Sequence, residues 1–106
     1  MNIIDKHNAN KYTWGINCES FVFLETESLS VKQELMPPGT NEQLHFHTIA
    51  QQVFYVSKGE ATFYVEENQS IHIEPGQKHF VVNNSSVDLE FLVISQPSTK
   101  NDRIQV

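Results

Sequence analysis

Short apolar stretches alternate with polar turns about every ten residues, and no segment keeps a helical period. Apolar and polar residues take turns over 29–35, as they do in a strand with one covered face. Lys58-Gly59 and Pro75-Gly76 are turn signals. We therefore expect strands over 20–24, 29–35, 52–57, 60–65, 71–73, 78–83 and 89–94. Regular spacing of short strands favours an all-β sandwich or barrel.

The segment 52–57 is apolar on both faces, so both of its faces should be covered. A chain of 106 residues has the size of one domain and buries only a modest share of its surface. We expect a single domain over 1–106, with a loose polar arm over 1–12 and a polar tail over 96–106. A homodimer is expected to cover the second face of 52–57.

The net charge is −6, and the seven basic residues are scattered along the chain. Without a basic stripe, neither nucleic acid nor an anionic membrane surface is an expected partner. The single cysteine, Cys18, cannot form an internal disulfide. No apolar run suits a signal peptide or a membrane span. These observations favour a soluble cytoplasmic protein.

His45 and His47 are two residues apart in a strand-like segment, which places both imidazoles on one face. Such a pair is half of a metal site, and neutral imidazole suits Zn, Cu, Fe and Ni. His79 follows a turn, and antiparallel strands could return it to the pair. The alternative is that the pair lies on the wet face of a strand and His79 on the surface.

The spacing around these histidines resembles the first of two sequence motifs of the cupin family. Gly39 is followed by five residues, His45-Phe46-His47, four residues, Gln52, six residues and Gly59. The second motif is looser here: Pro75-Gly76, two residues, His79, three residues and Asn83, with Glu74 where the motif usually has its proline. The resemblance to a small single-domain cupin covers residues 29–95.

This resemblance implies a double-stranded β-helix, or jelly roll: a small barrel of two antiparallel sheets. It implies one divalent metal ion on His45, His47 and His79, with Zn, Fe, Mn, Ni and Cu as candidates. The glutamate ligand of the family is Gln52 in this chain. Either Gln52 binds the metal or a water on it, or Gln52 is structural and three histidines bind alone; a third alternative is a decayed site without metal.

The resemblance also implies a metal-dependent enzyme, either dioxygenase-like on an enol-type molecule or isomerase-like on a sugar-like compound. A neutral set of ligands suits a small, anionic, chelating substrate, which slightly favours the dioxygenase. The alternatives are a small-molecule binding or sensing protein and a non-catalytic protein with a degenerate site. No catalytic residue is assigned, and Gln52 offers no carboxylate base.

Four further residues have simpler expectations. Glu42 is expected either to orient an imidazole or to be a plain loop residue. Asn83 should hydrogen-bond backbone at the end of a strand. Asp102 and Arg103 are expected to form either a contact of the tail, for example across a dimer, or an exposed ion pair. A minority of the aromatic residues should line a pocket: the candidates are Phe46, Phe54, Tyr55, Phe63, Phe80 and Phe91.

Overall fold

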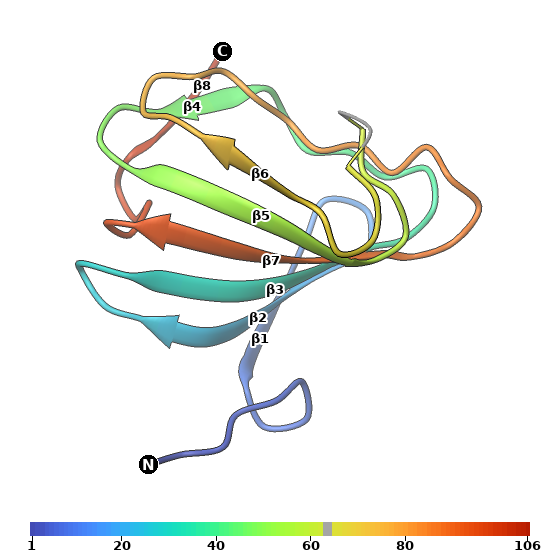
Figure 1. Ribbon diagram of the computed structural model, residues 1–106, viewed down its shortest axis with the longest axis horizontal. Coiled ribbons are helices and arrows are strands. Elements are labelled where there is room, and N and C mark those ends of the chain that lie inside the picture. The colour runs from blue at the N-terminus through green and yellow to red at the C-terminus, as the bar shows by residue number, and fades with distance from the viewer. Residues whose placement is uncertain (63–64) are drawn as a thin grey trace.

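The computed structural model describes residues 1–62 and 65–106, and within these ranges every regular element is a strand (Figure 1). The strands are β1 (Asn10–Trp14), β2 (Cys18–Glu25), β3 (Ser30–Met36), β4 (His45–His47), β5 (Gln51–Lys58), β6 (Ser70–Ile73), β7 (Leu89–Gln96) and β8 (Arg103–Gln105). None of the described residues forms a helix that could cross a membrane.

The strands form two antiparallel sheets that enclose the interior of a small barrel. Six strands make the larger sheet, in the order β1-β2-β3-β7-β5-β6, and β4 pairs with β8 in the smaller one. Figure 1 shows the larger sheet curving beneath β4 and β8. Isolated bridges join Asn41 to Val82 and His45 to His79, which extends the smaller layer. The expected fold class, an all-β barrel of two antiparallel sheets, is confirmed.

Five of the expected strands are present as β2, β3, β5, β6 and β7. The expectation over 78–83 is wrong, because that segment forms single bridges to the smaller sheet instead of a continuous ladder. Of the expected strand over 60–65, residues 63–64 lie outside the described residues. β1 begins at Asn10, within the expected arm, and β8 lies within the expected tail.

The turn at Gly59 ends β5 and needs a glycine for two reasons. Its φ is 84°, and an added Cβ would lie 2.7 Å from the carbonyl oxygen of Asp88. A side chain at this position would therefore meet both left-handed strain and a backbone clash. After this turn the chain returns as β6, which pairs with β5 from Gln52 to Tyr55.

Inward-facing residues change from polar to apolar along each central strand. In the larger sheet, the polar residues Gln52 and Ser95 are cross-strand partners, and so are the apolar residues Met36 and Leu89. The polar ends of neighbouring strands therefore meet, and so do the apolar ends. From polar to apolar the series are Ser30, Lys32, Glu34, Met36 on β3; Gln52, Phe54, Val56 on β5; and Ser95, Val93, Phe91, Leu89 on β7.

The barrel thus has an apolar end and a polar end. The apolar end is filled by a cluster of buried side chains that includes Met36, Val56, Val81 and Leu89. The expected burial of 52–57 holds fully for its inner face, whereas the outer residues Val53 and Tyr55 are half-buried in the single chain. A homodimer that covers this outer face stays a prediction.

Candidate metal centre

A cavity of about 270 Å³ occupies the polar end of the barrel. Its lining comes from the larger sheet, from β4 and from β8. Two aromatic residues of the expected group, Phe54 and Phe91, are part of this lining. The cavity also contains the three sequence-predicted residues His45, His47 and Gln52, and the backbone bridge from His45 brings His79 beside them.

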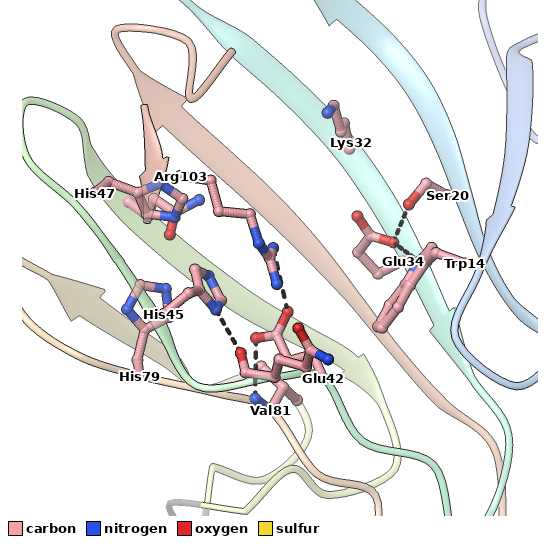
Figure 2. Close-up of polar contacts among 12 residues, drawn as sticks. Trp14, Ser20, Lys32, Glu34, Glu42, His45, His47, His79, Val81 and Arg103 are labelled. Carbon is pink, nitrogen blue, oxygen red and sulfur yellow. Dashed lines mark hydrogen bonds and ion pairs between the residues drawn. The ribbon is translucent and has the colours of Figure 1, made fainter. Parts of the chain in front are cut away.

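The three histidines form one compact, buried cluster. His45 and His47 lie on β4, and His79 lies on the segment that bridges to it. One nitrogen of each ring can be chosen so that all three lie within 4.8 Å of one another. Their exposed fractions are 2%, 4% and 4%. The three side chains could therefore hold a metal ion, as Figure 2 shows by their convergence.

Each ring is oriented by a hydrogen bond from Nδ1 to a backbone carbonyl. The acceptors are Gln43 at 2.7 Å for His45, Asp102 at 3.1 Å for His47, and Gln77 at 2.8 Å for His79. A carbonyl only accepts, so Nδ1 carries the proton and Nε2 keeps its lone pair. This is the arrangement in which an imidazole binds a metal through Nε2.

Burial lowers the pKa of all three histidines, because charging an imidazole away from water is unfavourable. For His45 burial brings the pKa to about 4, with the bond to the Gln43 carbonyl opposing the shift. The rings are therefore neutral near pH 7. A metal ion would not have to displace protons from them.

Three polar atoms in this region are buried without a hydrogen-bond partner among the described residues. They are Nε2 of His47, Nε2 of His79 and Oε1 of Gln52. The Gln52 amide nitrogen donates to Oγ of Ser95 at 3.0 Å, which leaves its oxygen unpaired. A buried unpaired polar group costs about 1–3 kcal/mol. Imidazole nitrogen and amide oxygen are both atoms that a divalent ion accepts, so the donor set fits a metal of the kind that takes nitrogen and oxygen ligands.

Asp102 is not an exposed tail residue: the expected tail contact is made within the chain, and the alternative of an exposed ion pair is wrong for it. It is 8% exposed, and its carboxylate accepts from the backbone of Thr48, Ile49 and Ala50 and from the Thr48 hydroxyl. Burial raises the pKa of Asp102, but these hydrogen bonds outweigh it and lower the pKa to about 2. The Asp102 carboxylate therefore fixes the turn after His47. The backbone carbonyl of Asp102 also orients the His47 ring.

Glu42 does not hydrogen-bond an imidazole, so the expected orienting role is not seen. Its carboxylate accepts from the backbone N–H of Val81 at 3.0 Å and lies 3.9 Å from the Arg103 guanidinium (Figure 2). Burial raises the pKa of Glu42 to about 7, and Arg103 opposes the shift. Glu42 thus ties the segment before His45 to the segment after His79. Asn83 donates to the carbonyls of Met36 and Val87, as expected.

Glu34 is a cavity residue that the sequence did not single out. It projects inward from β3, on the opposite side of the cavity from the histidines in Figure 2. Its Oε2 accepts from the Ser20 hydroxyl and from Nε1 of Trp14. Burial raises the pKa of Glu34, and these two bonds offset part of the shift. The only signal in the sequence was the polar series Ser30, Lys32 and Glu34, which carries no information on the face it occupies.

Comparisons with solved structures support the fold at low sequence identity. The polyketide cyclase RemF from Streptomyces resistomycificus aligns with a TM-score of 0.83 at 16% identity, over all of this chain and 85% of that one. A predicted oxalate decarboxylase from Thermotoga maritima aligns at 0.78 and 17%, over 92% of this chain and all of that one. A cupin sugar phosphate isomerase from Silicibacter pomeroyi aligns with a TM-score of 0.72 at 16% identity, over 92% of this chain and 76% of that one.

No curated protein sequence matches this one at a significant level. The family model for the cupin domain, in contrast, matches residues 33–95, which is more than half of the chain. That range contains Gln52 and the three histidines of the cluster. The match agrees with the barrel, the two motifs and the structural neighbours, and the chain belongs to the cupin domain family.

Proposed function

We propose that this protein is a metal-dependent enzyme that acts on a small anionic molecule, with one divalent ion held by His45, His47, His79 and Gln52. The observation that carries the proposal is the group of buried, unpaired ligand atoms in this region. Such atoms cost stability unless a partner satisfies them. When bound, the metal would supply Lewis-acid chemistry, which polarises a substrate oxygen.

Two cations in the cavity lining support an anionic substrate. Arg103 is 3.9 Å from Glu42, and it donates no hydrogen bond among the described residues. Its donors are therefore free for a carboxylate or an enolate oxygen. Lys32 also lines the cavity, where its ammonium donates to the Tyr12 hydroxyl at 3.2 Å. A metal and two cations together would hold an oxygen-rich anion at more than one point.

The named activities of the structural neighbours favour an enzyme, but they do not select a reaction. One neighbour is named a cyclase, one a predicted oxalate decarboxylase and one a sugar phosphate isomerase. Both the dioxygenase-like and the isomerase-like chemistry remain proposals for this chain. They differ in one measurable respect, because only the dioxygenase consumes dioxygen.

The direct test is metal analysis of the purified protein after chelation and reloading. Wild type should carry about one ion per chain, and His45→Ala and His79→Ala should lose it, because three protein ligands are the usual minimum. His72→Ala is the matched control, since His72 is exposed on β6 and lies outside the cluster. Gln52→Leu should weaken binding about tenfold or more if its oxygen is a ligand.

A wild type that carries no metal and takes up none would overturn the proposal.

If the protein does bind metal, oxygen consumption with enol-type compounds separates the two chemistries. Turnover that needs metal but no dioxygen supports the isomerase-like reaction. Tight binding without turnover would identify a binding protein instead of an enzyme.

A further inference from the structure

Glu34 is a carboxylic acid with one oxygen fixed and the other free. Ser20 and Trp14 both donate to Oε2, the latter at 3.0 Å. No described residue hydrogen-bonds Oε1, and Glu34 lines the cavity. Figure 2 shows this second oxygen directed away from Ser20 and Trp14. Two donors on one oxygen thus lock the carboxyl group and present its other oxygen to the cavity.

This geometry differs from that of the other carboxyl groups near the site. Asp102 accepts hydrogen bonds on both oxygens, and Glu42 accepts from Val81 and faces Arg103. Both are engaged in holding the walls together. Glu34 alone, among the described acidic residues that line the cavity, combines a fixed orientation with an oxygen that has no protein partner. That combination is what a proton-transfer group requires.

We propose that Glu34 carries protons to and from a carbon atom of the substrate held at the histidine cluster. The substrate class follows from the surrounding groups. It is a small carboxylate with a carbonyl or hydroxyl on the neighbouring carbon, because such compounds chelate a divalent ion and have a C–H bond that a carboxylate can break. This inference rests on the proposed function, and it supplies the base that Gln52 does not.

The groups that face Glu34 are suited to both of its protonation states. The charged neighbours of Glu34 are Lys32 on the same strand, Arg103 on β8 and Glu42 on the loop before β4. The neighbours on β2 are Ser20 and Cys18. Burial raises the pKa of Glu34 from its ordinary value, while Ser20, Trp14, Lys32 and Arg103 offset part of the rise. A carboxyl group whose pKa is raised towards neutrality serves well as acid and base.

The step is a proton transfer and needs no further reactant. The Glu34 carboxylate takes the proton from the carbon beside the carbonyl, and the C–H bond breaks. The electron pair of that bond moves into a new carbon–carbon double bond, and the carbonyl π pair moves onto its oxygen, which Arg103 and Lys32 stabilise by charge. The protonated Glu34 then returns the proton, or a deuteron taken up from the solvent, to the same carbon of the enolate, which restores the carbonyl compound.

The test is carbon-bound hydrogen exchange in heavy water, followed by proton NMR. Metal-loaded protein is mixed with pyruvate, 2-oxobutyrate or 2-oxoglutarate, and the loss of signal from the carbon beside the carbonyl is timed against the same metal in buffer. Wild type should accelerate exchange of at least one compound. Glu34→Gln should slow it by a factor of about 10²–10⁴. Glu90→Gln is the matched control, because Glu90 is a half-buried carboxyl on the same sheet that does not line the cavity.

Oxalate gives a second readout that does not depend on turnover, because it is a planar dianion similar in shape to the enolate of a 2-oxo acid. Calorimetry in two buffers of different ionisation enthalpy measures both affinity and proton uptake. Wild type should take up more protons than Glu34→Gln on binding, by up to about one, since the anion favours protonation of the carboxylate. The Glu34→Gln affinity should stay within about threefold of wild type, because Arg103 and the histidines are unchanged.

Ser20 and Trp14 are positioning residues in this scheme, and Trp14→Phe keeps the apolar body of the side chain while it removes the N–H donor. Exchange should slow about tenfold. The pH midpoint of exchange should rise, because one of the bonds that favours the carboxylate is lost. A merely structural role for Trp14 would leave that midpoint in place.

Exchange by Glu34→Gln at the wild-type rate would overturn the assignment. So would a metal-loaded wild type that binds oxalate but exchanges none of the three compounds faster than metal in buffer. If the protein holds neither metal nor oxalate, the proposed function has failed, and this inference fails with it. The metal analysis therefore separates the two failures.

Discussion

The two ends of the barrel are built from the same strands, but one end buries apolar side chains and the other buries polar ones. At the apolar end, Met36 and Leu89 are cross-strand partners with no measurable exposure. At the other end Gln52 pairs with Ser95, and the described residues leave three buried ligand atoms without partners. The first end gains stability from burial, whereas the second holds polar groups that cost stability in the free protein.

This difference shows how the fold separates stability from chemistry within one short strand. On β3, Glu34 and Met36 are two residues apart and project from the same face. One faces the cavity and the other packs in the apolar cluster. The apolar end can therefore anchor the position of every inward side chain at the polar end. We expect substitutions at the two ends to have effects of different kinds.

The largest expected effect is on stability, from Leu89→Ala. The side chain is fully buried in the apolar cluster, so its loss should lower the free energy of unfolding by about 2–5 kcal/mol through lost burial and a cavity. Ser30→Ala is the matched comparison, since Ser30 is 2% exposed but lines the cavity at the polar end. It should change stability by no more than about 0.5 kcal/mol. Urea denaturation measures both, and equal effects would contradict the division.

A second prediction concerns the turn that Asp102 holds. Asp102→Ala removes the acceptor of the Thr48, Ile49 and Ala50 N–H groups, and it should lower the free energy of unfolding by about 3 kcal/mol. It should also weaken metal binding, because the turn directly follows His47. Asp5→Ala, in the exposed arm, serves as control. If Asp102→Ala holds metal as tightly as wild type, the link between this turn and the site is wrong.

The smallest expected effect is the pH dependence of the metal-free protein. The pKa of His45 is about 4 when folded and about 6.5 when unfolded, so between these values the unfolded chain binds a proton that the folded chain does not. Stability should fall as the pH is lowered from 6.5 towards 4, by up to about 1.4 kcal/mol per pH unit for this residue. Denaturation at pH 7 and pH 5 measures the loss, which should shrink in His45→Ala.

Most strands and the four motif residues of the site could be predicted from the sequence, whereas the other polar residues of the cavity could not. A period of two located β3, and the motif spacing placed His45, His47, His79 and Gln52 in one region. It did not show that Ser30, Lys32 and Glu34 face inward. Hydrophobicity alone assigns the apolar face of β3 to the interior, but at this end the interior is a polar cavity.

The role of Asp102 was also invisible in the sequence, for a different reason. Its hydrogen bonds reach Thr48 and Ala50, which are more than 50 residues earlier. No local pattern records a contact of that range, because it depends on β8 pairing with β4. A polar segment such as 96–106 looks the same whether it is free or docked. Only the topology distinguishes the two.

The contact between His47 and Asp102 also sets an order of events during synthesis of the chain. The carbonyl that orients the His47 ring belongs to a residue translated 55 positions later. When the ribosome has just made the first histidine motif, β8 does not yet exist, and the turn after β4 has no carboxylate to hold it. The cavity therefore closes only after residues 102–105 have emerged from the ribosome.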